Sequence, residues 1–283
     1  MYAQPTRLDE ALELAVRYRP RILAGGTDLM VGAGPDLSGP ILDVSRIAEL
    51  KGIVVGADTI AIGAGVTWTE LLAADLPPGF DGLKAAAKEV GSVQIQNRAT
   101  LAGNLCNASP AADGVPPLLT LDADIELRAP GKQRRLPLAE FILGNRRTQL
   151  DGGEMVTAIH LPRRLAEGRS SFLKLGSRRF LVISIVSVAA LLVADEERAR
   201  VAEARIAVGA CSAVPQRLLA LEQALKGSPM SSAFGSQVTA GHLEALAPID
   251  DVRATAGYRR EAALLLVRQA LEACRIGETG GMA

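Results

Sequence analysis

Strand patterns and helix patterns follow one another irregularly along this chain of 283 residues, and this irregular order limits its fold more than any other feature. Short apolar runs in the first quarter of the chain are strand candidates, at 21–24, 41–44, 53–55 and 59–62. The connection Gly56-Ala57-Asp58 is of the hairpin type. A doubly wound sheet would need a helix after each strand, in repeated βαβ units. The chain lacks that regularity, so we expect an α+β fold.

The middle of the chain contains the expected domain boundary. Runs at 125–128 and 155–161 alternate like half-buried strands, and the polar stretch 163–170 follows them. Beyond it come three strand patterns and two helix patterns, at 172–175, 184–193, 204–208, 215–225 and 258–274. We therefore expect one domain over 1–164, with subdomains 1–52 and 53–164, and a second over 165–283 that combines a three-stranded sheet with helices.

Local capping patterns predict two helix starts. The T-x-x-D sequence at Thr6 precedes a helix pattern, and the T-x-x-E sequence from Thr67 to Glu70 is a capping box. Between these helices and the strand pattern at 125–128, the stretch 79–123 is irregular and rich in Gly, Asn, Ser and Pro. It is too apolar for disorder, so we expect a functional, loop-rich region there.

Balanced charge and scattered metal-binding residue types exclude several functions. The 31 basic and 31 acidic residues cancel, whereas proteins that follow a phosphate backbone carry a basic excess, so we expect no nucleic-acid partner. The three cysteines and two histidines lack C-x-x-C, H-x-x-x-H or H-E-x-x-H spacing, so we expect no metal or iron-sulfur cluster in this chain. The odd cysteine count favours a cytoplasmic location, and the longest apolar run, 186–194, is too short to span a membrane.

The first candidate site follows the strand pattern at 21–24. Gly25 and Gly26 stand at the strand end, where residues without a side chain permit close backbone approach, so that successive amide N–H groups can point at one anion. A helix that starts at Thr27 would add the field of its N-terminus. Glycine turns are common after strands, so this pattern alone leaves a simple turn and a phosphate-binding loop both open.

Residues 94–113 form the second candidate site. This segment carries Asn, Gln, Thr, Ser, Arg and Asp at a density that a solvent-facing turn does not require. One interpretation is an asparagine-rich loop that satisfies its own backbone through Asx turns. The other is a second cradle, in which Thr100 and Asn104 bind a polar ligand and Asp113 accepts a hydrogen bond from a ribose hydroxyl or a ring N–H.

Other signatures give no competing site. The sequence contains no complete G-x-G-x-x-G fingerprint, no G-x-x-x-x-G-K-[ST] phosphate loop and no G-x-S-x-G elbow. Cys106, inside the polar segment, is expected to be a small buried thiol. The arginine pairs at 146–147 and 178–179 have two interpretations: contact with phosphates, and the more common position as solvated or interface residues.

Taken together and in this order, the motifs at 24–29 and 97–104 resemble those of the FAD-binding subunit of the molybdenum hydroxylases, the xanthine dehydrogenase and carbon monoxide dehydrogenase family. The similarity continues through 107–110, 113, 116–119, 121–123, 153–156 and 174–179, and so covers nearly the whole chain. The resemblance implies a PCMH-type FAD-binding fold of two α/β subdomains, followed by a C-terminal domain with a three-stranded sheet and helices.

The resemblance also implies cofactor-binding residues. The ADP part of FAD would be wrapped by Ile22, Leu23, Ala24, Gly25, Gly26, Thr27, Asp28 and Leu29. The second cradle, for the pyrophosphate and the ribityl chain, would consist of Thr100, Ala102, Gly103 and Asn104. Asp113 would bond the flavin side, Val156 would make an apolar contact, and Lys174 would approach the cofactor and offset part of the pyrophosphate charge.

The function implied by the resemblance is electron transfer through non-covalent FAD. The FAD would accept electrons from [2Fe-2S] clusters of a partner chain and pass them to NAD⁺ or another acceptor. The implied partners are a small chain with two [2Fe-2S] clusters and a large chain with molybdopterin, in a dimer of heterotrimers. The flavin supplies the chemistry, so we assign no catalytic acid or base to this chain.

Three positions depart from the usual pattern of the family. Val93, Gln96 and Ala102 stand where relatives more often have proline, arginine and glycine. Ala102 matters most, because its methyl group restricts the backbone φ angle in the second cradle. Two alternatives therefore stay open: an assembly subunit without FAD, and a self-contained flavin oxidoreductase of the vanillyl-alcohol oxidase type.

Overall fold

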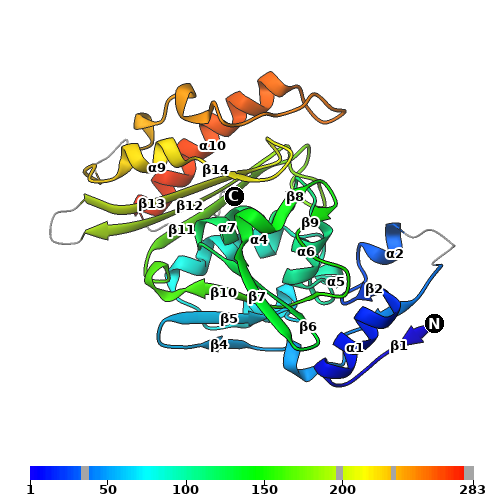
Figure 1. Ribbon diagram of the computed structural model, residues 1–283. Coiled ribbons are helices and arrows are strands. Elements are labelled where there is room, and N and C mark those ends of the chain that lie inside the picture. The colour runs from blue at the N-terminus through cyan, green and yellow to red at the C-terminus, as the bar shows by residue number, and fades with distance from the viewer. Residues whose placement is uncertain (33–37, 196–199, 231–233, 277–283) are drawn as a thin grey trace.

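The computed structural model describes residues 1–32, 38–195, 200–230 and 234–276. A small N-terminal sheet is followed by a five-stranded sheet and a C-terminal sheet, with helices between and around them (Figure 1). This combination of mostly antiparallel sheets with helices confirms the predicted α+β class. None of the described helices is long and apolar enough to cross a membrane.

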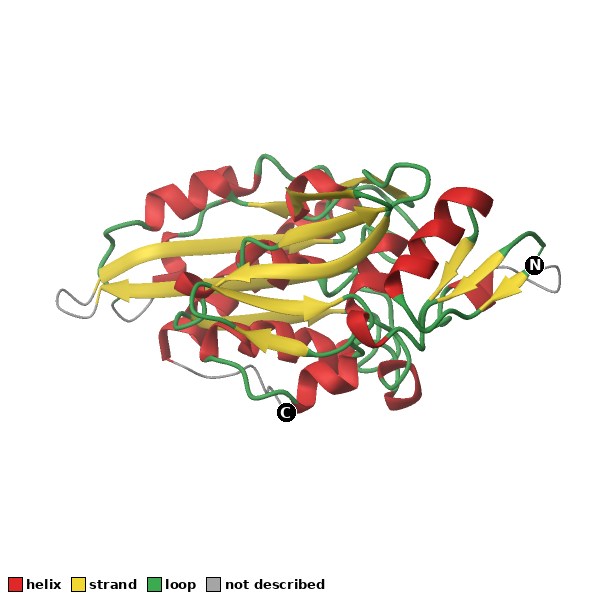
Figure 2. Ribbon diagram, turned by 60° about the horizontal axis from the view of Figure 1, so that its bottom comes forward, coloured by secondary structure: helices red, strands yellow, loops and turns green. Residues whose placement is uncertain are grey.

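The N-terminal sheet is parallel and lies at one end of the molecule (Figure 2). Its strands, in spatial order, are β1 (Tyr2–Ala3), β3 (Ile41–Asp43) and β2 (Arg21–Leu23). The edge strand β2 leads into the first glycine motif and then into the short helix α2 (Leu29–Gly32). The N-terminal sheet therefore fixes where the first candidate site begins.

Helix α1 (Leu8–Tyr18) packs beside this sheet through a buried face of Leu8, Ala11, Leu12 and Ala15, which have helical spacing. The predicted Thr6 cap is wrong, because the residue before the helix is Arg7 and it makes no side-chain capping bond. Instead, the Glu49 carboxylate accepts a hydrogen bond from the Leu8 amide at 3.1 Å. A residue far away in the sequence thus satisfies the helix start, and a local pattern cannot reveal it.

The five-stranded sheet is antiparallel and has the last of its strands at its centre. In spatial order it contains β4 (Ile53–Val55), β5 (Thr59–Gly63), β10 (Met155–Pro162), β6 (Asp124–Ala129) and β7 (Lys132–Pro137). The predicted hairpin through Gly56-Ala57-Asp58 is confirmed. A short two-stranded sheet, β8 (Ile142–Gly144) with β9 (Arg147–Thr148), follows helix α8 (Leu138–Phe141).

The stretch 79–123 is largely helical, so the predicted loop-rich region is wrong. It contains α4 (Asp81–Glu89), α5 (Val93–Gln96), α6 (Leu101–Asn107) and α7 (Val115–Thr120). These helices have four to nine residues each, which is too short to produce a clear apolar period in the sequence. Before them, α3 (Trp68–Ala73) starts at the predicted Thr67 capping box, which is confirmed by hydrogen bonds in both directions between Thr67 and Glu70.

The C-terminal sheet contains the three predicted strands and a short fourth. In spatial order these are β11 (Arg169–Leu175), β12 (Val186–Asp195), β13 (Arg200–Gly209) and the two-residue β14 (Gln216–Arg217). Helices α9 (Leu219–Leu225) and α10 (Ala256–Ile276) cover one face, and α4 and α7 cover the other (Figure 1). The predicted helix patterns near 215–225 and 258–274 are therefore confirmed.

Strand β12 contributes to two hydrophobic cores at once. Val188, Ala190 and Leu192 point into the core beneath α9 and α10, whereas Leu191 belongs to the large core of the N-terminal part. Alternate residues of a strand face opposite sides, so a strand with two covered faces reads as a continuous apolar run. The C-terminal sheet is thereby packed directly against the part of the chain that holds the two glycine motifs.

Asp122 connects these parts electrostatically. Its Oδ2 accepts a hydrogen bond from Arg164 at 2.7 Å, and its Oδ1 accepts from Arg205 at 2.6 Å and from Arg217 at 2.8 Å. Arg205 lies on β13 and Arg217 on β14. Their side chains are only 13% and 20% exposed, so water hydrates them poorly, and Asp122 shares the balance of their charge with Glu203 and Glu222.

We expect Asp122→Asn to lower the free energy of unfolding by about 1–3 kcal/mol, because the three guanidinium groups lose a charged partner. Asp122 has a φ of +50°, and asparagine tolerates this conformation, so the variant changes charge and little else. Urea unfolding of the full chain measures the effect, with the exposed Asp75→Asn as the matched control. Equal stability of both variants would show that these arginines do not depend on Asp122.

Candidate functional site

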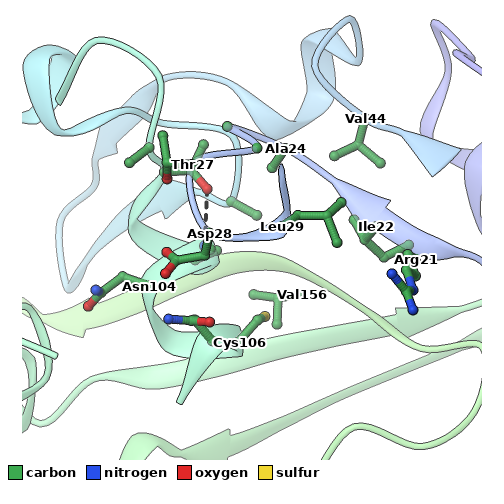
Figure 3. Close-up of a pocket in the computed structure, with 18 of the residues that line it drawn as sticks. Arg21, Ile22, Ala24, Thr27, Asp28, Leu29, Val44, Asn104, Cys106 and Val156 are labelled. Carbon is green, nitrogen blue, oxygen red and sulfur yellow. Dashed lines mark hydrogen bonds between the residues drawn. The ribbon is translucent and has the colours of Figure 1, made fainter. Parts of the chain in front are cut away.

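A cavity of about 510 Å³ lies where the two glycine-bearing segments meet. Its walls come from the segment 21–29, from α3 and α6, and from the start of β10. Figure 3 shows Ala24, Thr27 and Leu29 on one side, with Asn104 and Val156 on the other. The volume is within the range of small-molecule and cofactor sites.

Gly25 brings the two segments into backbone contact. A Cβ atom added at Gly25 would lie 2.1 Å from the carbonyl oxygen of Arg98, which is far too close for any side chain. Gly26 has a φ of +75°, a conformation that glycine adopts without strain. Two motifs that are distant in the sequence therefore touch directly, and the touching surfaces are main chain.

Most of the predicted cofactor-binding residues line this one cavity. They are Ile22, Ala24, Gly25, Gly26, Thr27, Asp28, Leu29, Thr100, Ala102, Gly103, Asn104 and Val156. Three predicted residues, Leu23, Asp113 and Lys174, are not part of its lining. The carbonyl of Leu23 accepts a hydrogen bond from the Val44 amide at 2.9 Å, so this residue holds the glycine turn to β3.

The helix that was expected to begin at Thr27 is too short to provide a strong dipole. It begins at Leu29, and α2 has only four residues. A helix of one turn carries few aligned peptide units. Any attraction of this wall for an anion therefore depends mainly on the individual amide groups of the glycine turn.

Thr100 and Gly103 act together at the start of α6. The Thr100 hydroxyl oxygen accepts a hydrogen bond from the Gly103 amide at 3.0 Å, and a Cβ atom at Gly103 would lie 2.8 Å from that oxygen. The hydroxyl proton of Thr100 remains able to donate to a ligand. Ala102 lies within α6 and its methyl group is buried, so alanine occupies a helical position that suits it.

Asp113 and Lys174 bind one another. The Lys174 Nζ lies 2.6 Å from Asp113 Oδ2, and the Ser184 hydroxyl donates to Asp113 Oδ1 at 2.5 Å. Both charged side chains are less than a tenth exposed. Burial raises the pKa of the Asp113 carboxyl, and the charge of Lys174 opposes this effect. The pair fastens the segment before α7 to β11, and part of the Lys174 charge is already neutralised.

The cavity has two buried polar atoms without a hydrogen-bond partner among the described residues. They are Nε1 of Trp68 and Oδ1 of Asn104. Buried polar groups are nearly always paired, so these two atoms are exceptions. Both are inaccessible from the cavity surface, and a Cβ atom added at Gly114 would lie 2.9 Å from Asn104 Oδ1. Trp68 was not predicted as a site residue from the sequence. Its position directly after the Thr67 cap was the available signal.

The prediction for Cys106 is wrong, whereas Arg146 is exposed as expected. Cys106 is exposed and lines the cavity, whereas it was predicted to be buried. Desolvation within the cavity wall still raises the pKa of its thiol to about 12, so the thiol stays protonated at neutral pH. Arg146 also lines the cavity, a position in which the phosphate contact that was one of its two interpretations stays open.

The residues present fit a dinucleotide flavin. Apolar side chains such as Ile22, Leu29 and Val156 suit aromatic rings, and the glycine turn presents amides to a pyrophosphate. The hydroxyl group of Thr100 can serve the polar groups of such a molecule.

Two family models match the chain. "FAD binding domain in molybdopterin dehydrogenase" matches residues 1–164, and "CO dehydrogenase flavoprotein C-terminal domain" matches residues 171–274. Together they include every residue that lines the cavity.

Curated relatives agree with these models. The putative xanthine dehydrogenase FAD-binding subunit XdhB of Escherichia coli K12 is 30% identical over 264 residues, which covers 91% of this chain and 90% of the relative. The nicotinate dehydrogenase FAD-subunit of Eubacterium barkeri is 33% identical over 236 residues, which covers 80% of this chain and 79% of the relative.

Solved structures share the fold. A chain of the Cu,Mo-CO dehydrogenase superposes with a TM-score of 0.89 at 23% identity, covering 98% of this chain and 97% of that one. A chain of the carbon monoxide dehydrogenase from Hydrogenophaga pseudoflava gives 0.88 at 26% identity, with the same coverage. These findings confirm the predicted family, the oxidoreductase class and FAD as the cofactor: the chain belongs to the FAD-binding subunits of the molybdopterin dehydrogenases.

Proposed function

We propose that this chain is the electron-transferring FAD subunit of a molybdenum hydroxylase complex. In this proposal it accepts electrons from [2Fe-2S] clusters of a small partner subunit, and the reduced FAD passes them to NAD⁺ or another acceptor. Molybdopterin belongs to a large partner subunit. The complex is a dimer of heterotrimers, and the odd cysteine count supports a cytoplasmic location.

The observation that carries this proposal is the backbone contact between Gly25 and Arg98, which closes one cavity from two motifs of the family. The relatives support the part played by partners, because their names describe subunits or a medium chain of dehydrogenases, as in the carbon monoxide dehydrogenase medium chain of Hydrogenophaga pseudoflava. One related solved structure is described as lacking the Mo-pyranopterin moiety of its molybdenum cofactor.

The flavin ring supplies the redox chemistry when FAD is bound, and the protein supplies binding and orientation. In our proposal the segment from Ile22 to Leu29 holds the ADP part, and Thr100 to Asn104 hold the pyrophosphate and ribityl chain. Val156 packs against the cofactor. Asp113 and Lys174 act at the flavin side as a coupled pair, because each needs the other to balance its buried charge.

The first test is a flavin assay on the purified full chain. We expect the absorbance of oxidised flavin and the release of intact FAD on acid denaturation. The loaded chain alone should not bleach when organic substrates are added, since it depends on partner clusters for electrons. A chain that stays colourless after incubation with FAD would favour an assembly subunit, and bleaching by substrate alone would favour a self-contained oxidoreductase.

The second test introduces one methyl group between the two motifs. We expect Gly25→Ala to weaken FAD binding by about 5- to 150-fold. The added methyl group displaces the Arg98 carbonyl, and such overpacking costs about 1–3 kcal/mol. Fluorescence titration with FAD measures the affinity, and circular dichroism checks that the chain is folded. Gly144→Ala is the control, since a Cβ atom there meets nothing within 4 Å. Unchanged affinity in Gly25→Ala would contradict the role of this contact.

A further inference from the structure

We propose that Arg146 is a cofactor-binding residue that contacts the pyrophosphate of FAD. The proposal rests on the proposed function, since it assumes FAD in the cavity. Arg146 stands in the turn between β8 and β9, its side chain is exposed, and it lines the cavity.

The backbone of Arg146 is held in an unfavourable conformation. Its φ is +58°, in the left-handed region, which is uncommon for a residue with a side chain. Its amide donates to the Ala108 carbonyl at 3.0 Å, and Ala108 itself has a φ of +46°. Two residues in this conformation thus fasten the turn to the end of α6. Such conformations cluster at ligand-binding sites, where the surrounding structure enforces them.

The guanidinium group of Arg146 has unused hydrogen-bond donors. Its side-chain contact is a long one, 3.4 Å from Nη1 to the carbonyl oxygen of Asn107, and among the described residues it forms no ion pair with a carboxylate. An arginine carries five N–H donors in a planar fork that matches phosphate oxygens. By contrast, Glu154, an acid of the same lining, is already bound in two places by Arg134.

The negative charge of FAD favours a cationic side chain in the lining of this cavity. The pyrophosphate carries the two negative charges of FAD, and Arg21 and Arg146 are the cationic side chains in the lining of the cavity. Lys174, which was expected to offset that charge, is bound to Asp113 instead. Figure 3 shows Arg21 far across the cavity from Asn104, whereas Arg146 contacts Asn107, one helical turn from Asn104. The position of Arg146 is therefore the better match to the second cradle.

A purely structural role is the competing explanation. A cation near the last carbonyls of a helix is favourable, and Arg146 could serve α6 in this way alone. That role would affect the stability of the chain but would not distinguish ligands with phosphate groups from ligands without them.

The test compares FAD binding by three variants of the full chain after removal of flavin. Arg146→Asn removes the charge and keeps a residue that tolerates a positive φ, and Arg146→Lys keeps the charge without the fork. Arg147→Gln is the matched control, because the neighbouring Arg147 is exposed and is not part of the cavity lining. Fluorescence titration gives the affinity for FAD at low and high salt, and competition with ADP and with adenosine separates the phosphates from the base.

We expect Arg146→Asn to weaken FAD and ADP binding by about 10- to 100-fold, the loss that corresponds to one hydrogen-bonded charge pair. Its FAD affinity should also depend less on salt than that of the wild type. Adenosine binding should not change, Arg146→Lys should recover part of the affinity, and Arg147→Gln should behave like the wild type.

Two results would overturn the inference while leaving the proposed function intact. One is wild-type FAD affinity in Arg146→Asn, with or without a lower melting temperature. The other is an equal loss for adenosine and ADP, which would show a general change in the cavity. If the wild-type chain itself binds no FAD, the proposed function fails and the inference fails with it.

Discussion

The contact between Gly25 and the carbonyl of Arg98 is the constraint on which the site depends. No side chain fits between these two segments, since a Cβ atom would lie 2.1 Å from the oxygen. The contact brings the turn after β2 against the segment before α6, and the cavity is the space that their two walls enclose. The glycine turn presents main-chain amides to the cavity beside polar side chains such as Thr100, so a chain with zero net charge can hold a charged cofactor.

The C-terminal sheet supports this arrangement from behind. Strand β12 gives alternate residues to two cores, and the pairs Asp113–Lys174 and Asp122–Arg205 cross between the sheet and the preceding part of the chain. Because these pairs are poorly exposed, separating the two parts would leave charges without partners. The cavity walls are thus held by packing and by buried charge at some distance from the cavity itself.

The sequence predicted long helices and strands better than short ones. Long strands such as β10 and β12 and the helix α10 have enough residues to display a period, and they lie where the patterns indicated. Helices α5 and α6 do not, because a few residues cannot show helical spacing. Helix α6 is stabilised by its Thr100 cap and by the burial of Leu101, Ala102 and Leu105. The prediction for the start of α1 was wrong for a related reason, since the capping partner Glu49 is distant in the sequence.

The sequence by itself determined the family, the cofactor and twelve of the residues that line the cavity, because glycine turns and capping threonines are local features that a motif records. Only the tertiary structure decided which side chains complete the site. Trp68 and Arg146 line the cavity although they lie outside the two motifs, and Lys174 forms an ion pair with Asp113. Burial and charge pairing depend on neighbours in space, so they are fixed only when the chain has folded.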